Sequence, residues 1–396
     1  MEPDSTEDHE GDVICCAFRH QVGGHKCVLQ VTENLICKPC EESERMFYNN
    51  VPAILQPYVP GYRGEVSVYC KENGGHKTLH AKVSKSILRS CRTYADGNCE
   101  IEEGNWGKTR LNYCIKNESL WKNNSPEKFI MFDNLIANFE RPCALDIKLC
   151  RYYHGMCSDP SKKLVLEQKC NNSTSSTLGF RIGGMQIYQH ETRKMLQFNK
   201  HYGMSINDHQ VIELLKIFFG RRSGTSIRDI SNTIKNIHNA VLNQKDFIFL
   251  SVSLLFFYDI QETQHSVPLF QPEADLDAKG QNPAKAGCKV RLIDFEKVIP
   301  VSDEEEHLIP QHLKENINFG ITNLSNILDG FAIENDLIKG KARSWISGPG
   351  LWSGACRLLL VLTSEMRRYL KEHQWRRQLS GLILTLRYES VGSKQD

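Results

Sequence analysis

The sequence predicts an α+β chain that folds as two lobes. Three observations lead to this prediction. Short apolar strands and tight turns dominate the first third, helical periodicity appears only after residue 140, and long apolar strand-like segments lie between or after the helical ones. A chain of 396 residues is also long enough for two or three structural units.

Two hairpins predict the first lobe. Residues 27–40 hold two short apolar strands about Glu33-Asn34, and residues 65–83 hold a second pair about Asn73-Gly74-Gly75. A glycine pair supplies the positive φ angles that a tight turn needs. Residues 128–139 then read as an apolar strand followed by a break, while the polar stretch before them shows no clear periodicity.

The second lobe combines helices and strands. Residues 209–220 and 226–244 have apolar residues at spacings of three and four, which predicts two amphipathic helices. Residues 247–259 and 289–298 read as strands, and the polar segment 260–288 between them, rich in proline and glycine, is expected to be a loop. The apolar face of the second helix consists of Ile227, Ile230, Ile234, Ile237 and Val241.

Composition limits the possible partners and location. The formal net charge is only +2, so no overall field favours nucleic acid, and any anion site must be local. No apolar run is long enough for a membrane-spanning helix. The acidic N-terminus lacks the apolar core of a signal peptide, and the 15 cysteines are scattered, so we expect free thiols and a cytoplasmic and/or nuclear location. The sequence names no protein partner.

Candidate catalytic residues lie at strand ends. In "RPCALDIKLC" (141–150), Asp146 and Lys148 are two residues apart and therefore share one face of a strand. Such a pair can be a salt bridge, or it can serve chemistry. Lys38 in "LICKP" could reach nucleotide phosphates from a strand beneath a hairpin, and Asp294 in "LIDF" could hold magnesium, although each could also be an ordinary strand-end residue.

These motifs together resemble the inositol polyphosphate kinase family. "PCALDIK" is similar to the family signature PxxxDxKxG. "HQVGGH", "ICKP", "STSSTLGFRIGGMQIYQ", "NKHYG", "SLLFFYD" and "LIDF" follow in the order of the inositol hexakisphosphate kinase branch, from about His20 to about Leu328. The resemblance implies the family's two-lobe fold, which is distantly similar to protein kinases and ATP-grasp enzymes.

The resemblance also implies how ATP and Mg²⁺ would bind. Lys38 would contact the ATP phosphates. Asp133 and Leu135 would form the hinge that meets adenine, Leu135 through its backbone. Asp146 would lie beside the nucleotide at the ribose, and Asp294 would hold the magnesium ion.

An inositol polyphosphate is the acceptor that the resemblance implies. Lys148 would bridge the transferred phosphoryl group and the acceptor, which makes Asp146 and Lys148 the expected catalytic pair. The lysines expected to bind the acceptor's other phosphates are Lys162, Lys169, Lys200 and Lys297. The expected reaction converts inositol hexakisphosphate to a diphosphoinositol pentakisphosphate.

Two departures from the family pattern leave alternatives open. Cys150 replaces the last glycine of the signature, which could constrict the acceptor site or demand an unusual φ angle. Glu296-Lys297 follows Asp294-Phe295, and a lysine there is similar to the inositol trisphosphate kinase branch. The alternatives are a multikinase-like enzyme that phosphorylates hydroxyls of tris- or tetrakisphosphates, a weakened polyphosphate-binding pseudokinase, and a zinc-dependent regulator built on Cys37, Cys40 and their neighbours.

The expected organisation has four parts. Residues 1–12 form a disordered acidic tail, residues 13–135 form the ATP-side lobe, and residues 136–340 form the lobe that binds the inositol phosphate and the metal. Residues 341–396 form a tail outside the family pattern, in which 365–379 could be a basic amphipathic helix.

Overall fold

A computed structural model describes residues 10–90, 104–117, 121, 126–151, 159–189, 192–220, 222–260, 287–301 and 310–346. Contacts divide the chain into a first unit, Met1–Ile333, and a second, Glu334–Asp396. The described part of the second unit is the C-terminal portion of helix α10 (Asn318–Ile346). The expected basic helix at 365–379 and most of the expected loop at 260–288 lie outside the described residues.

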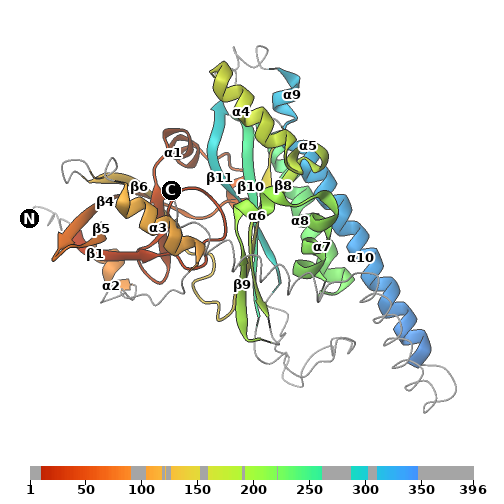
Figure 1. Ribbon diagram of the computed structural model, residues 1–396. Helices are drawn as coiled ribbons and strands as arrows, with labels where there is room; N and C mark the ends of the chain where they lie inside the picture. The colour runs from red at the N-terminus through yellow and green to blue at the C-terminus, as the bar shows by residue number, and fades with distance from the viewer. Residues whose placement is uncertain are drawn as a thin grey trace, which may run out of the picture. The chain divides into compact units, whose positions relative to one another are not determined.

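The first lobe is a closed antiparallel barrel in the strand order β1-β2-β3-β6-β4-β5 (Figure 1). Its interior is filled by small and branched apolar side chains, among them Val13, Leu29 and Val68. Closure leaves no unpaired strand edge and so makes a rigid support. The barrel strands are β1 (Glu10–Ala17), β2 (Leu29–Gln30), β3 (Leu35–Pro39), β4 (Tyr62–Asn73), β5 (His76–Ser84) and β6 (Glu127–Asp133).

Both predicted hairpins of this lobe are confirmed. Leu29 pairs with Cys37 across the first turn, and β4 meets β5 at Gly74 and Gly75, whose φ angles are +58° and +80°. The helices of the lobe are α1 (Glu42–Asn49), the 3₁₀ helix η1 (Gln56–Tyr58), α2 (Lys85–Ser90) and α3 (Trp106–Lys116). The last two fall in the polar stretch where the sequence showed no periodicity.

One boundary differs from the expectation. Strand β1 begins at Glu10, so residues 10–12 belong to the barrel and not to the acidic tail. Asp12 pairs with Lys82 of β5 in the strand register, and its carboxylate lies 3.2 Å from the ammonium of Lys71. Backbone pairing and this ion pair accommodate an acidic residue that composition alone assigned to a tail.

The second lobe is built on a five-stranded antiparallel sheet in the order β11-β10-β7-β8-β9 (Figure 1). Strand β10 (Phe247–Asp259) has the predicted bounds, and β11 (Lys289–Pro300) runs two residues beyond its prediction. Strand β7 (Pro142–Leu149) is central, and β8 (Phe180–Gln189) and β9 (Lys194–Phe198) complete the sheet.

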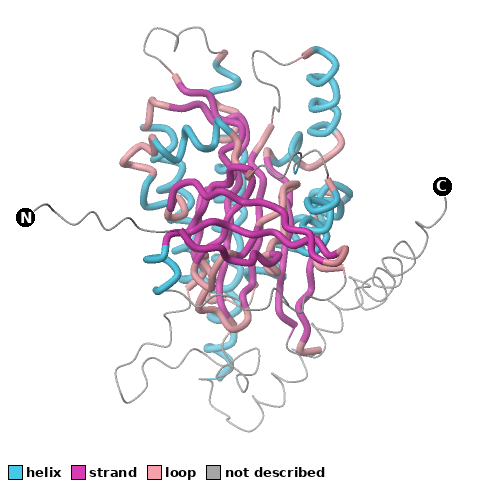
Figure 2. The backbone as a smooth tube through the Cα atoms, turned by 90° about the vertical axis from the view of Figure 1, so that its left-hand side faces the viewer, coloured by secondary structure: helices cyan, strands magenta, loops and turns pink. Residues whose placement is uncertain are grey.

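Helices cover one face of this sheet. Helices α7 (Asp208–Phe219), α8 (Gly224–Asn243) and the first part of α10 pack against it on the side away from the barrel (Figures 1 and 2). Ile227, Ile230 and Ile234 of α8 are buried there, as the spacing predicted. The shorter helices of the lobe are α4 (Pro160–Asn171), α5 (Ser175–Leu178), α6 (Lys200–Ser205) and α9 (Gln311–Lys314). Among the described helices, none has the length and apolar character needed to cross a bilayer.

Candidate active site

The central strand β7 presents Asp146 and Lys148 on one face. Leu145, Ile147 and Leu149 are fully buried in the core beneath the sheet, whereas Asp146 and Lys148 keep partial exposure on the opposite face, toward the barrel lobe. The alternation expected from the sequence therefore holds along this strand.

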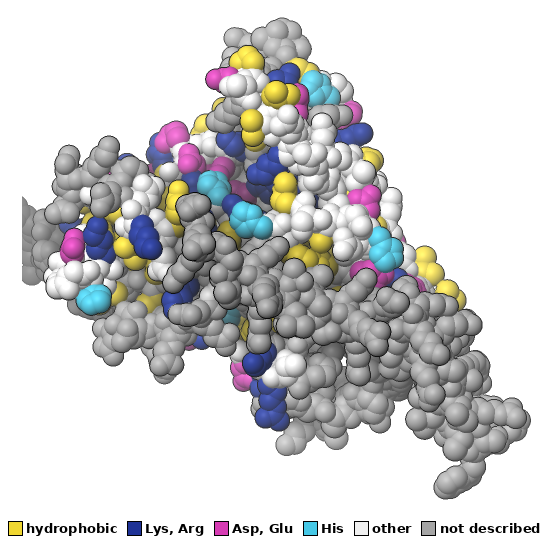
Figure 3. Space-filling view, in the orientation of Figure 1, with side chains coloured by type: hydrophobic (Ala, Val, Ile, Leu, Met, Phe, Trp, Pro, Cys, Tyr) yellow, Lys and Arg dark blue, Asp and Glu magenta, His cyan; other side chains and the backbone are white. Residues whose placement is uncertain are grey.

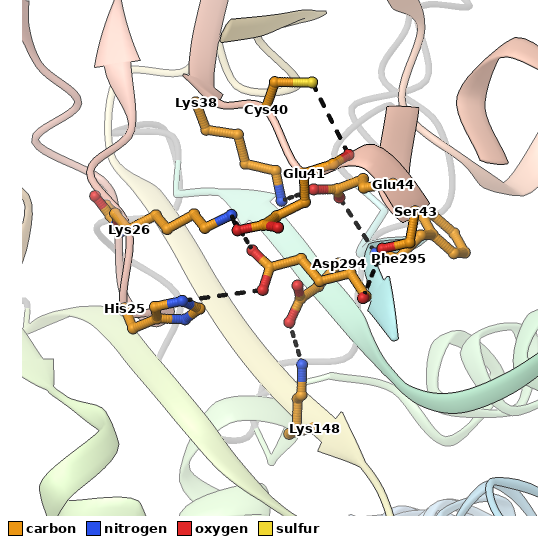
Figure 4. Close-up of polar contacts among 12 residues, drawn as sticks. His25, Lys26, Lys38, Cys40, Glu41, Ser43, Glu44, Lys148, Asp294 and Phe295 are labelled. Atoms are coloured by element: carbon orange, nitrogen blue, oxygen red, sulfur yellow. Dashed lines mark hydrogen bonds and ion pairs between the residues drawn. The ribbon is translucent and has the colours of Figure 1, made fainter. Parts of the chain in front are cut away.

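Lys148 reaches Asp294 across the intervening strand. Ser253 of β10 pairs with Lys148 on one side and with Ile293 on the other. Because a serine is short, the lysine side chain can extend over it, and its ammonium forms an ion pair with Asp294 Oδ2 (Figure 4). The pair is only partly buried, with 13% and 26% of the side chains exposed, so both groups keep some contact with solvent.

An irregularity in β11 gives Asp294 its position. The register between β10 and β11 shifts around Ser251 and Ser253, which marks a bulge. Asp294 has a φ angle of +68°, which is uncommon for a non-glycine residue and typical of strained functional positions. Burial raises the pKa of the Asp294 carboxyl, but the ammonium groups of Lys148 and Lys38 lower it more, so this carboxylate stays ionised.

A buried ion pair holds Lys38. Its ammonium lies 2.8 Å from Glu44 Oε2 of α1, and no part of the Glu44 side chain is exposed. The other oxygen, Glu44 Oε1, accepts the backbone N–H of Phe295 at 3.2 Å. Burial lowers the pKa of Lys38, but the carboxylates of Glu44, Asp294 and Glu296 outweigh it and raise the pKa, so Lys38 is charged.

Helix α1 thus ties the barrel to the bulge of β11. Ser43 (Figure 4) donates a hydrogen bond to the carbonyl of Glu296 at 2.8 Å. The ring of Phe47 stacks on that of Phe295, with 3.7 Å between the ring centres. Lys26 adds an ion pair with Glu296 at 3.3 Å. These contacts fix Lys38 and Asp294 relative to each other although they come from different lobes.

A cleft between the lobes holds these groups. Its lining includes the charged residues Lys38, Asp146 and Asp294, together with Leu135 and Ile136. Apolar residues form most of the remaining wall, namely Val22, Val28, Ile36, Phe132, Ala144, Leu255, Phe257 and Ile293. A narrow apolar slot that also holds charged groups suits a planar base with attached phosphates.

The expected hinge residues Asp133 and Leu135 line this cleft, but the Asp133 carboxylate is already engaged by another side chain. Arg63 holds it in a two-pronged ion pair, with distances of 2.7 and 3.0 Å, and the Asp133 N–H donates to the carbonyl of Gly61 at 2.9 Å. The Asn134 N–H is engaged as well, because it donates to the carbonyl of Asn34 at 2.7 Å. The backbone of Leu135 is therefore the part of the expected hinge that could meet a base.

A glycine loop closes over Asp146. A side chain on Gly23 would place its Cβ 2.3 Å from Asp146 Oδ2, and one on Gly183 would place it 2.7 Å from Asp146 Cγ. Gln21 holds the loop by donating to the carbonyls of Gly23 and Lys26 at 2.9 and 2.7 Å. Gly23 of "HQVGGH" and Gly183 of "RIGGM" are therefore required by the close approach of the loop and of β8 to Asp146, and Gly24 by its φ angle of +79°.

Basic side chains extend the site beyond Lys148. Arg181 pairs with Lys148 in the strand register and donates to Ser175 Oγ at 2.9 Å. Burial lowers the pKa of Lys169, and the nearby charges of Arg181, Lys200 and Lys148 lower it further. Like charges brought this close form a surface for a polyanion, and Figure 3 shows lysine, arginine and histidine side chains gathered near the middle of this face.

The other two lysines expected at the acceptor are placed differently. Lys297 is exposed beside α1 and is not grouped with Lys169 and Lys200. Burial raises the pKa of Glu41, but Lys26 lowers it more, and the charge of Lys297 also contributes to lowering it. The backbone of Lys162 lies in α4, and its side chain is outside the described residues.

Cys150 is buried and has an ordinary backbone conformation. Among the described non-glycine residues only Arg193 and Asp294 have a positive φ, so Cys150 has an ordinary backbone. Its thiol is fully buried, 4.0 Å from the thiol of Cys170 in α4. The possibility that this position demands an unusual φ angle is therefore wrong for this chain, and constriction of the acceptor site stays a prediction for kinetics to test.

The site fits a metal ion that is shared with substrate phosphates. Among the described residues, no three His, Cys, Asp or Glu side chains come together as a protein-only metal site. Magnesium commonly takes one or two carboxylates and completes its shell with phosphates and water, and the ionised Asp294 beside Asp146 suits that arrangement. The proposed zinc pair is separated, because Cys37 lies in the barrel core and Cys40 packs on the other core.

Two parts of the site were missed from the sequence. Glu44 lies in "EESERMF", where a run of acidic residues looks like a solvated helix start, and only its complete burial distinguishes it from Glu41 and Glu42. Helix α3 was missed because it lies within a long polar stretch, and only Asn105, whose side chain accepts the Lys108 N–H, marks its start.

Comparison with known proteins shows which family this chain resembles. A family model described as inositol polyphosphate kinase matches residues 129–329, about half of the chain. Inositol hexakisphosphate kinase 3 of Homo sapiens is 26% identical over 385 residues, covering 78% of this chain and 93% of that protein. Inositol hexakisphosphate kinase 2 of Homo sapiens is 25% identical over 410 residues, covering 82% and 96%. A crystal structure of the inositol phosphate multikinase Ipk2 of S. cerevisiae, in complex with ADP and Mn²⁺, matches with 20% identity and a TM-score of 0.48 over 75% of this chain and 99% of that one.

The protein is a phosphotransferase of the kinase class, built from a barrel lobe and a sheet lobe that meet at a cleft. The chain belongs to the inositol polyphosphate kinase family. Its substrates are therefore inositol phosphates.

Proposed function

We propose that the chain transfers the γ-phosphoryl group of ATP to a phosphate of inositol hexakisphosphate, which yields a diphosphoinositol pentakisphosphate and ADP. The observation that carries this proposal is the position of Lys148. It pairs with Asp294 at the end of the cleft and also adjoins the cationic group formed by Lys169, Arg181 and Lys200. The names of the similar human kinases support the same acceptor.

Each side chain has a defined task in this proposal. ATP would lie with adenine at the backbone of Leu135, its ribose at Asp146, and its phosphates near Lys38. An ion held by Asp294 would be Mg²⁺, and when bound it would offset charge on the phosphates. The protein's own contribution is alignment and electrostatic stabilisation, since phosphoryl transfer needs little covalent help.

The transfer itself is an in-line displacement. An oxygen of the acceptor phosphate forms the new P–O bond as the bond from the γ-phosphorus to the β–γ bridging oxygen breaks, and ADP leaves with that oxygen. Lys148 lies where charge moves between donor and acceptor, so its ammonium would stabilise the transition state more than the bound substrates. Lys169 and Lys200 would hold phosphates that do not react.

A hydroxyl kinase of less phosphorylated inositols is the other candidate. The resemblance of Lys297 to the trisphosphate kinase branch favoured it, but Lys297 lies by Glu41 and apart from the cationic group. The cytoplasm and/or the nucleus remains the location that we propose, from the scattered cysteines of the sequence.

A kinase assay tests the proposal. Purified protein is incubated with ATP and Mg²⁺ and with inositol tris-, pentakis- or hexakisphosphate, and the products are resolved by charge. We expect a product more anionic than hexakisphosphate, together with one ADP for each product molecule. Turnover of the trisphosphate alone would favour the hydroxyl kinase, and phosphate binding without turnover of any acceptor would favour the pseudokinase.

A further inference from the structure

Helix α3 contacts both halves of the site through one side chain. Trp106, at its first position, is 8% exposed, and its indole N–H donates to the carbonyl of Gly23 at 3.1 Å. Gly23 belongs to the loop that covers Asp146. The tryptophan therefore supports the loop at the nucleotide side of the cleft.

Two cationic side chains lie over the same indole ring. The Lys200 ammonium lies 5.6 Å and the Arg110 guanidinium carbon 5.8 Å from its centre, and Arg110 also lies 4.7 Å from the ring of Tyr113. Cation–π contacts of this kind fix a long basic side chain without neutralising it. The positive charge of both groups is therefore retained for another partner.

No carboxylate compensates these two cations within the part of the chain that the structure describes. Neither Arg110 nor Lys200 forms an ion pair there, and Arg110 Nε is buried without a hydrogen-bond acceptor. A buried guanidinium N–H without an acceptor is costly, and planar N–H donors suit phosphate oxygens. The arrangement therefore calls for an anion.

This pair continues the cationic group next to Lys148. Burial lowers the pKa of Lys200 and the charge of Arg110 lowers it further, while Lys200 in turn acts on Lys169 and His25. The positive groups thus run from the reacting end of the cleft toward α3.

The start of α3 is anchored to the sheet lobe. The Asn105 amide donates to the carbonyl of Arg19 at 2.8 Å and to Gln197 Oε1 at 3.3 Å, and Gln197 donates to Gln186 of β8 at 2.7 Å. Because these contacts cross from the barrel lobe to β8 and β9, Arg110 is held near Lys200 before any ligand arrives, which reduces the ordering cost of binding.

We propose that Arg110 and Lys200, held by Trp106, form a subsite for a phosphate of the acceptor other than the one that reacts, and that this subsite favours highly phosphorylated inositols. The identity of the acceptor rests on the proposed function. Arg110 and Trp106 come from α3, which precedes the residues matched by the family model, whereas Lys200 is the first residue of α6 and lies within them.

Calorimetric titration of the full chain with inositol hexakisphosphate tests this subsite. Arg110→Ala should weaken binding about 10- to 100-fold, as loss of a charge-assisted contact predicts, while the KM for ATP changes less than about twofold. Arg110→Lys should recover part of the loss. Lys116→Ala is the matched control, because Lys116 is an exposed cation in the last turn of the same helix.

A second ligand and a second variant sharpen the test. Inositol trisphosphate should lose less affinity than hexakisphosphate on Arg110→Ala, because fewer phosphates reach the subsite. Trp106→Phe keeps a ring beneath the cations but removes the hydrogen bond to Gly23, so it should raise the KM for ATP more than it weakens acceptor binding.

The possible failures can be told apart. If wild-type protein binds hexakisphosphate and Arg110→Ala binds it equally well with an unchanged melting temperature, the subsite is refuted and the proposed function stands. An equal loss in Lys116→Ala would reduce the effect to general charge and would also refute it. If wild-type protein binds neither inositol phosphate, the proposed function fails, and the subsite falls with it.

Discussion

Replacing Glu44 by glutamine would remove the negative charge that holds Lys38 while preserving size and one hydrogen-bond acceptor. In the native protein Glu44 is fully buried, lies 2.8 Å from the Lys38 ammonium and accepts the Phe295 N–H. The substitution therefore loosens the lysine that should meet ATP and also the link between α1 and the bulge of β11.

The stability that Glu44→Gln should lose follows from the burial of the ion pair and from the charges that remain near Lys38. Breaking a buried ion pair by removing one partner costs about 3–5 kcal/mol. Asp294 and Glu296 also raise the pKa of Lys38 and would still stabilise its charge, and glutamine retains an acceptor, so we expect about 2–3 kcal/mol of lost stability. In a protein of this size that lowers the melting temperature by about 3–4 °C. Because Lys38 would move toward Asp294, kcat should fall by about 100-fold.

Differential scanning fluorimetry and steady-state kinetics on the same preparations check both numbers. Asp329→Asn is the control, because the Lys235–Asp329 pair is equally short at 2.7 Å but has 45% and 37% of its side chains exposed. An exposed pair contributes less than about 1 kcal/mol, and its loss should leave kcat unchanged. If Glu44→Gln melts no lower than Asp329→Asn and turns over normally, the buried pair does not organise the site.

Three further predictions follow from particular residues. Asp294→Asn should keep the fold, because asparagine tolerates a positive φ, and should lower kcat at least about 100-fold; near-normal turnover at ordinary magnesium would remove Asp294 from the metal role. Burial and Arg19 lower the pKa of His20 to about 4, below its unfolded value, so the unfolded state gains a proton first and stability should fall as pH decreases from about 6.5 to about 4. Urea titrations across that range should show a flatter profile for His20→Asn, and identical profiles would contradict the assignment. Cys150→Gly should lower the free energy of unfolding by about 2 kcal/mol, because it leaves a cavity at a buried site and increases the backbone entropy of the unfolded chain. The KM for the acceptor should stay unchanged, and a lower KM would support the constriction hypothesis.

Local patterns in the sequence were sufficient for much of the fold. The pair Gly74-Gly75 needs positive φ angles, so the β4–β5 hairpin followed from the chemistry of two residues. The isoleucine spacing determined the buried face of α8, and alternation placed Asp146 and Lys148 on one face of β7. These features depend on neighbours within one or two turns of the chain, which a sequence displays directly.

The partner of each charged group was decided only by the tertiary structure. Lys148 meets Asp294 because Ser253, distant from both in sequence, lies between them on β10 and is small enough to be crossed. Glu44 is distinct from its acidic neighbours only because α1 buries it against Lys38. Arg110 and Lys200 meet over the Trp106 ring because Asn105 and its neighbours dock α3 on the sheet lobe. Such pairings depend on register, bulges and lobe contacts between distant segments, and no local spacing encodes them, because the energy that selects them arises when the segments meet.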